Sequence, residues 1–212
     1  NTYRIGVLLD SLDVPLWVEE LLKWLQQENA FQIVCYITNC GAKPSGRSGM
    51  VYRILRSVDH RMLALPGNPF RRVTLQTGDT PVLPIIPIQK KFSDYLPEES
   101  LEELKQYRPD FLLRFGFRIL RGKVLTSARY GILSLHHGDT AHYRGGPPAF
   151  WEVVEKAPET AVTLQLLTEE LDAGFILGKA VLRTDTTSFY RNQHKLYWAG
   201  LHLFKTELNS IA

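Results

Sequence analysis

The chain has 212 residues, 44% of them apolar, and is therefore long enough to bury a sizeable hydrophobic core. Lysine and arginine number 25 and aspartate and glutamate 22, and a net charge of +3 is too small to predict a nucleic-acid partner. No apolar run approaches the length of roughly 18 residues that a transmembrane helix needs, and no signal peptide is visible.

Two cysteines, Cys35 and Cys40, lie close together with no third cysteine to join them. Their spacing is not that of a zinc site, and a chain of this length needs no disulfide to fold. Reduced cysteines favour a cytoplasmic protein. Because the chain begins at Asn1 and not at methionine, we expect a piece of something longer.

The first 40 residues alternate between strand and helix patterns. Residues 4–9 and 31–37 are apolar runs typical of buried strands. Between them, residues 14–27 carry leucine and tryptophan at helical spacing, with Pro15 in the first turn. The order strand, helix, strand predicts a parallel α/β sheet.

Residues 41–80 are less regular and are expected to form an insertion. Within it, residues 41–49 are rich in glycine, serine, lysine and proline, which predicts a loop. Residues 51–63 predict a helix. Its role cannot be read from the sequence.

The alternation resumes after residue 80. The proline-interrupted run 82–88 predicts an edge strand. Helices are predicted at residues 97–107, 119–126, 147–155 and 188–209, and strands at 110–115, 131–135, 160–167 and 175–182. The last two strands should pair antiparallel around a loop at 169–174.

These elements assign the chain to the α/β class. We expect one domain over residues 1–212, with a Rossmann-like, mostly parallel sheet, flanking helices and antiparallel strands late in the chain. Residues 41–80 are its irregular insertion, and a C-terminal helix lies within 186–212.

The most unusual stretch follows the predicted strand 131–135. Ligands of parallel α/β sheets collect beyond the carboxyl ends of the strands, and this strand leads directly into His136 and His137 and a Gly/Pro-rich loop. Ser134 and His136 share a face of the strand because they are two residues apart. A carboxylate such as Asp172, in the later loop, could fix the tautomer of an imidazole. Hydroxyl, imidazole and carboxylate together would suit transfer of an acyl group to an amine.

Residues 131–182 resemble the 10-formyltetrahydrofolate-dependent formyltransferases, which act on methionyl-tRNA, glycinamide ribonucleotide or sugar amines. The resemblance lies in Ser134-Leu135-His136 at a strand end, then Arg144-Gly145-Gly146-Pro147-Pro148, and then Leu171-Asp172-Ala173-Gly174. Upstream, Gly116-Phe117-Arg118-Ile119-Leu120 resembles the folate-binding edge of the family. Order and spacing agree over about 50 residues, which is more specific than any short motif.

The resemblance implies a formyltransferase-type fold and a role for each matching residue. The catalytic residues would be His136, Asp172 and Ser134. The residues binding the cofactor, 10-formyltetrahydrofolate, would be Gly116, Phe117, Arg118, Ile119, Leu120, Leu171 and Gly174. The residues binding the acceptor would be His137, Tyr143, Arg144 and Gly145. A small-molecule amine, such as an amino sugar or sugar nucleotide, is the expected acceptor, with no nucleic acid and no membrane.

Ser134 departs from the family pattern, which has asparagine at this position. The resemblance implies that the asparagine amide of the family binds the formyl oxygen, and losing such a donor typically raises the barrier by about 2.7–4 kcal/mol. Two alternatives therefore stay open: a non-catalytic domain that binds folate or another ligand, and a hydrolase that releases formate from formyltetrahydrofolate.

Other sites have less support. His136 and His137 are adjacent on an extended chain and point to opposite sides, so no metal is expected. Asp139 and His142 are interpreted as loop residues. No Gly-x-Gly-x-x-Gly follows the first strand and no Gly-Lys-Ser/Thr phosphate loop is present, so neither a nicotinamide nor an ATP site is predicted.

Overall fold

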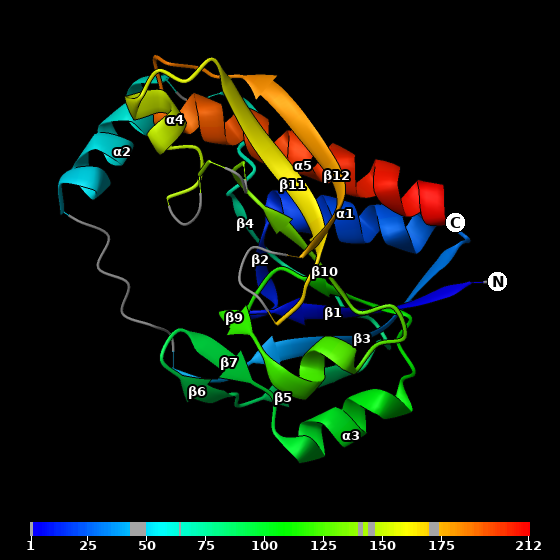
Figure 1. The fold of residues 1–212 in the computed structure, drawn as a ribbon. Helices are drawn as coiled ribbons and strands as arrows, with labels where there is room; N and C mark the ends of the chain where they lie inside the picture. Colours follow the sequence, from blue (N-terminus) through cyan, green and yellow to red (C-terminus); the bar gives the residue numbers. More distant parts are fainter. Residues whose placement is uncertain (1, 43–49, 64, 140–141, 144–146, 170–173) are drawn as a thin grey trace.

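The computed structural model describes residues 2–42, 50–63, 65–139, 142–143, 147–169 and 174–212, apart from the side chains of 50–53, 55 and 56. Its largest sheet consists of β1 (Tyr3–Leu9), β3 (Phe31–Asn39), β5 (Val82–Ile85), β8 (Phe111–Arg114), β10 (Ile132–His136), β11 (Glu159–Leu166) and β12 (Phe175–Arg183). The strand order is β12-β11-β10-β8-β1-β3-β5 (Figure 1). The five strands from β10 to β5 are parallel, and β11 and β12 are antiparallel, which confirms the predicted fold class.

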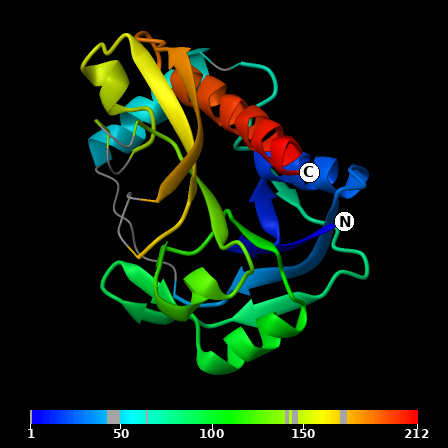
Figure 2. The same ribbon diagram turned by 45° about the vertical axis from the view of Figure 1, so that its right-hand side comes forward.

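Helices cover both faces of this sheet. On one face lie α1 (Leu16–Gln27) and α5 (Phe189–Ile211), which contact each other, while α3 (Glu98–Gln106) and the 3-10 helix η1 (Gly122–Thr126) lie on the other (Figures 1 and 2). Because side chains alternate along each strand, the buried residues form two cores. Val7 of β1 belongs to the core with α1 and α5, and Leu8 belongs to the core with α3 and η1.

Helix α1 begins later than its sequence pattern predicts. Residues Asp13–Pro15 form strand β2, which pairs antiparallel with β4 (Arg72–Thr74). Pro15 therefore precedes the helix, where its missing N–H costs nothing. From Leu16 onward the predicted apolar stripe is buried, as Trp17 and Leu21 illustrate.

The prediction of a helix at 119–126 is wrong in its first part. Residues Ile119–Leu120 form strand β9, which pairs with β7 (Ser93–Tyr95), and β7 in turn pairs with β6 (Ile88–Lys90). Only η1 follows as a helix. The pairing partner lies 26 residues upstream in the chain, so no local pattern reveals it.

The predicted edge strand exists but ends at Ile85 in β5, and Ile88 belongs to β6. The predicted helix at 147–155 is reduced to α4 (Trp151–Val154). Helix α2 (Met50–Leu63) lies where it was predicted, as do α3, the antiparallel pair β11 and β12, and α5. Most of the loop predicted at 41–49 lies outside the described residues.

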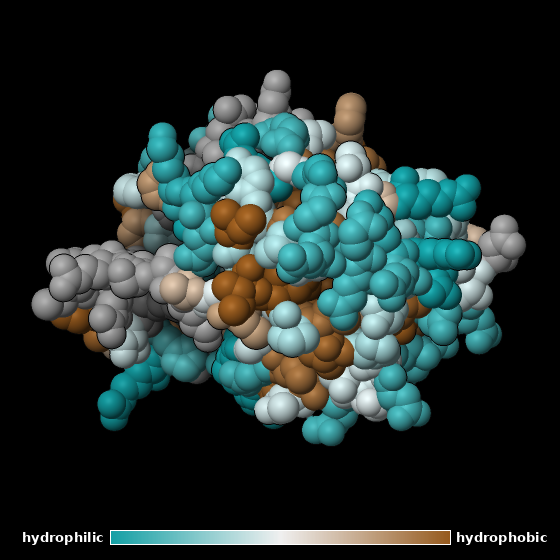
Figure 3. Space-filling view, turned by 90° about the horizontal axis from the view of Figure 1, so that it is seen from below, coloured by the Kyte–Doolittle hydropathy of each residue, from teal (hydrophilic) through white to brown (hydrophobic). Residues whose placement is uncertain are grey.

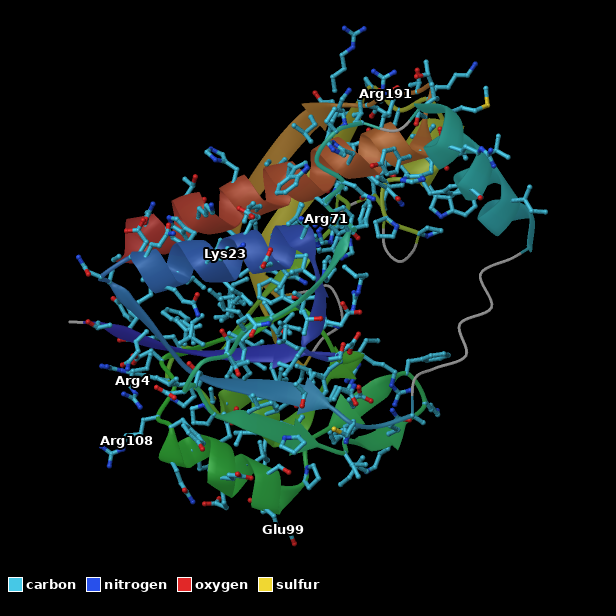
Figure 4. All side chains as sticks on the ribbon, turned by 180° about the vertical axis from the view of Figure 1, so that it is seen from behind. Arg4, Lys23, Arg71, Glu99, Arg108 and Arg191 are labelled. Atoms are coloured by element: carbon cyan, nitrogen blue, oxygen red, sulfur yellow. The ribbon has the colours of Figure 1, made fainter. Side chains whose placement is uncertain are left out.

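The two ends of the sheet differ in character. Arg4 and Arg108 project near the beginning of β1, at the opposite end from the carboxyl ends of the parallel strands (Figure 4).

The face seen from below is largely hydrophilic, with apolar side chains in patches between the charged ones (Figure 3). Among the described residues, no helix has the length and apolar character that crossing a membrane requires.

Candidate functional site

Two cavities open where β1, β8 and β10 end. The first, here called the Ser134 cavity, has a volume of about 130 Å³ and is lined by Ile119, Leu120, Ser134, His136 and Gln165 among others. The second, the Trp17 cavity, has a volume of about 310 Å³ and is lined by Asp10, Trp17, Phe70, His137 and Tyr197 among others. Arg114 and Leu135 line both cavities.

Ser134 lies in the middle of the sheet at the floor of its cavity. It pairs with Arg114 on the parallel neighbour β8 and with Gln165 on the antiparallel neighbour β11. Its side chain is buried, and its hydroxyl oxygen accepts a hydrogen bond of 3.2 Å from Nη1 of Arg114. The hydroxyl is thus oriented by a cationic donor on the next strand.

His136 lines the same cavity, as its spacing from Ser134 predicts. Its Nε2 lies 3.2 Å from the backbone oxygen of Tyr143. A carbonyl oxygen can only accept, so this hydrogen bond requires the proton on Nε2. Gly138 makes the arrangement possible, because a Cβ there would lie 2.9 Å from the Tyr143 oxygen and 3.1 Å from the imidazole.

His137 belongs to the other cavity. Its ring stacks on Tyr197 at 3.9 Å between centroids and meets the edge of Trp17. Burial, with a smaller contribution from His136, lowers the pKa of His137 to about 3, so the ring is neutral near pH 7. Its Nε2 is buried and has no hydrogen-bond partner within the described part of the chain.

The turn after β8 separates the two cavities. A Cβ at Gly116 would collide with the backbone of Leu9 and Asp10, so only glycine allows this close approach. Phe117 then adopts a left-handed φ of 65°, and its backbone N–H donates to the Asp10 carboxylate at 2.7 Å. The end of β1 therefore fixes the turn that follows β8.

The residues predicted to bind the cofactor divide between the cavities. Ile119 and Leu120 line the Ser134 cavity, whereas Gly116 and Phe117 line the Trp17 cavity. The side chain of Arg118 is engaged elsewhere: it forms an ion pair of 2.8 Å with Asp94, which is fully buried.

The later loop is described only at its end. A Cβ at Gly174 would collide with the Leu166 oxygen, so this glycine lets the loop return against β11. Asp172 and Leu171, predicted as catalytic and cofactor-binding residues, lie outside the described residues.

The predicted acceptor residues are also only partly described. Arg144 and Gly145 lie outside the described residues, too. The Tyr143 hydroxyl donates to Glu155 at 2.9 Å, and only the Tyr143 backbone oxygen reaches His136.

Several residues near the site were missed by the sequence prediction. Arg114 lines both cavities, and Gln165 has a buried Oε1 with no hydrogen-bond partner among the residues the structure describes. Glu152 on α4 is buried, and burial, to which the charge of Glu155 adds, raises its pKa. A charged residue inside the apolar run 111–115 was the one available signal for Arg114.

Comparisons with known sequences show the family of the chain. Residues 13–195 match the formyl transferase family. The methionyl-tRNA formyltransferase of Staphylococcus aureus strain JH1 is 28% identical over 162 residues, which are 72% of this chain and 52% of that protein. That of Bacillus velezensis is 28% identical over 116 residues, 54% of this chain and 37% of that protein. The chain thus matches about half, or less, of the length of these relatives.

Solved structures agree on the fold. Glycinamide ribonucleotide transformylase 1 from Geobacillus kaustophilus is similar over 100% of this chain and 99% of its own, with a TM-score of 0.68 and 15% identity. A formyltetrahydrofolate deformylase from Pseudomonas syringae is similar over 98% of this chain and 60% of its own, with a TM-score of 0.63 and 17% identity. Since the family match spans most of the sequence, the chain belongs to the formyl transferase family.

Proposed function

We propose that this chain transfers a formyl group from 10-formyltetrahydrofolate to the primary amine of a small molecule, such as an amino sugar or sugar nucleotide. The observation that carries the proposal is the shared cavity of Ser134 and His136 with Ile119 and Leu120. In this cavity, polar groups from the sheet face apolar walls. A site for a flat ring with polar edges usually has this composition.

The Ser134 cavity has the donor and acceptor character that a folate ring needs. Ile119 and Leu120 offer apolar contact to the ring faces. The buried Oε1 of Gln165, without a hydrogen-bond partner in the described residues, can accept from a ring N–H. The residues present therefore fit the cofactor, which would supply the formyl group.

His136 and Asp172 are proposed to carry out proton transfer during the reaction. The Tyr143 carbonyl accepts a hydrogen bond from Nε2 of His136, which fixes the position of the imidazole. A basic nitrogen beside the reacting carbon can take a proton from the attacking amine. Asp172 is proposed to orient the imidazole and to help keep the amine neutral.

The Trp17 cavity is the proposed acceptor site. Trp17, Phe70 and Tyr197 present aromatic surface to it, and Asp10 and Arg114 add one charge of each sign. Aromatic faces suit the apolar side of a sugar or base ring, and the charges suit its polar substituents. His137, Tyr143, Arg144 and Gly145 are proposed to assist on this side.

Titration calorimetry with a stable deaza analogue of 10-formyltetrahydrofolate tests the cofactor proposal. The wild type should bind the analogue, and His136→Ala should bind it within a few-fold. Turnover in His136→Ala should fall by about 10²–10⁴-fold, the range of a lost acid–base group. His202→Ala, on the exposed side of α5, is the matched control and should change neither quantity. A wild type that does not bind the analogue would remove the folate proposal.

Product analysis separates the proposed transfer from its alternatives. Incubation with 10-formyltetrahydrofolate and a panel of amino sugars should give a formylated amine. Formate released without a formylated amine would identify a hydrolase. Binding of the analogue without turnover would identify a non-catalytic folate-binding domain.

A further inference from the structure

We propose that Arg114 is a catalytic residue that donates a hydrogen bond to the formyl oxygen during transfer. The inference rests on the proposed function and names the side chain that stabilises the charge which develops there. Arg114 is the one side chain with N–H donors that lines both the Ser134 cavity and the Trp17 cavity, among the residues the structure describes.

The position of Arg114 follows from strand register. It pairs with Ser134 across the parallel strands β8 and β10, so the two side chains leave the sheet on the same face. Nη1 donates to the serine hydroxyl at 3.2 Å. The guanidinium therefore lies directly beside the Ser134 hydroxyl. Ser134 in turn is two residues from His136 along β10.

The guanidinium is also held from the other side. Its Nη2 donates to the backbone oxygens of Phe117 at 3.0 Å and Arg118 at 2.8 Å. These carbonyls belong to the turn that Asp10 and Gly116 fix in place. A donor fixed before the reaction needs no reorganisation when charge appears, and such preorganisation is the main source of oxyanion stabilisation.

Charge on the formyl oxygen is a consequence of the chemistry. The amine nitrogen forms a bond to the formyl carbon, and the bond from that carbon to the folate nitrogen breaks. The proton lost by the amine is available, through His136, to the departing folate nitrogen. While both bonds are partly formed, electron density moves onto the formyl oxygen, and a charged donor stabilises it more than a neutral one.

The small side chain at position 134 complements the large one at position 114. Ser134 is buried against the guanidinium, and a longer side chain would compete with it for the same space. Its hydroxyl accepts from Arg114 and keeps its own proton for donation. Arginine and serine thus provide donors as a pair on adjacent strands.

Arg114→Met keeps the apolar stem of the side chain and removes its guanidinium donors, and paired binding measurements test the result. Calorimetry uses the deaza analogue with its formyl group and the same analogue without it. Arg114→Met should weaken binding of the formyl form by about tenfold relative to the unformylated form, the size of one charged hydrogen bond. A purely structural role would weaken both forms equally, and an unchanged ratio would overturn the proposal.

Turnover gives the second readout, with hydroxylamine as a small amine acceptor. Arg114→Met should lower kcat by about 10²–10³-fold with little change in the KM for the cofactor. Adding Ser134→Asn to Arg114→Met supplies an amide donor in the vacated space and should restore at least tenfold. Retention of wild-type kcat in Arg114→Met, or no restoration by the amide, would count against the proposal while leaving the formyl-transfer function intact. A wild type without binding or turnover would instead remove the function itself.

Discussion

His137 shows how a histidine next to a proposed catalytic residue can stay neutral. The ring lies between Trp17 and Tyr197 and its pKa is lowered to about 3 by burial. In the unfolded chain the ordinary pKa is about 6.5. Below pH 6.5, His137 binds a proton in the unfolded state. In the folded state it binds that proton only near pH 3. Stability contributed by the neutral ring is therefore present above pH 6.5 and is lost as the pH falls toward 3.

His137→Phe should reduce this acid sensitivity, because phenylalanine keeps the aromatic contacts and does not titrate. The measurement is the Tm of wild type and variant between pH 7.5 and pH 5. The difference, variant minus wild type, should become more positive as the pH falls. His202→Phe, at an exposed position of α5, should show no such trend. Parallel pH profiles for wild type and His137→Phe would contradict the assignment.

Helix α5 connects the sheet to the segment that precedes α4. Nδ2 of Asn192 donates to the backbone oxygen of Ala149 at 3.2 Å and to the hydroxyl of Thr160 at 2.9 Å. Its Oδ1 accepts from the backbone N–H of Asp185 at 3.1 Å. Gln193 adds a hydrogen bond of 2.7 Å to the Pro148 oxygen. One turn of α5 thus holds the residues that lead into α4.

Asn192→Ala should lower the free energy of unfolding by about 2–3 kcal/mol, because it leaves several buried polar groups unpaired. Urea unfolding measures the change. Asn209→Ala is the matched control, since Asn209 is exposed on the same helix. Its effect should stay within about 0.5 kcal/mol. Equal effects of both substitutions would show that this junction contributes no more than a surface position.

The elements that the sequence predicts well are those with a strong local pattern. Helix α1 and strand β10 lie close to their predicted ranges, because hydrophobic periodicity alone determines which faces are buried. The errors occur where a distant segment intervenes. The sequence pattern around Ile119 predicts a helix, yet Ile119 pairs with Ser93 in a sheet. Single-sequence patterns contain no information about such a partner.

The sequence predicts the part of the candidate site that lies on one strand, β10. Ser134 and His136 lie on one face of β10, and His137 directly follows the strand, so their division between the two cavities follows from the alternation of side chains along an extended chain. Arg114 could not be assigned in this way, because its role depends on the register between β8 and β10. The proposed partnership of His136 with Asp172 stays a prediction.

The two cavities lead to a prediction about the complete site: ligand binding on its two sides should be separable by mutation. Ile119 lines only the Ser134 cavity and Phe70 only the Trp17 cavity, with β10 and the turn after β8 between them. Ile119→Ala should weaken binding of the formyl-folate analogue by about tenfold, the effect of losing roughly 1.4 kcal/mol of apolar contact. Phe70→Ala should leave that affinity within about twofold and raise the KM of the amine acceptor that the wild type is proposed to formylate. Calorimetry and steady-state kinetics on both variants measure these effects. If Phe70→Ala weakens the analogue as strongly as Ile119→Ala, the cofactor and the acceptor do not occupy separate sides of β10.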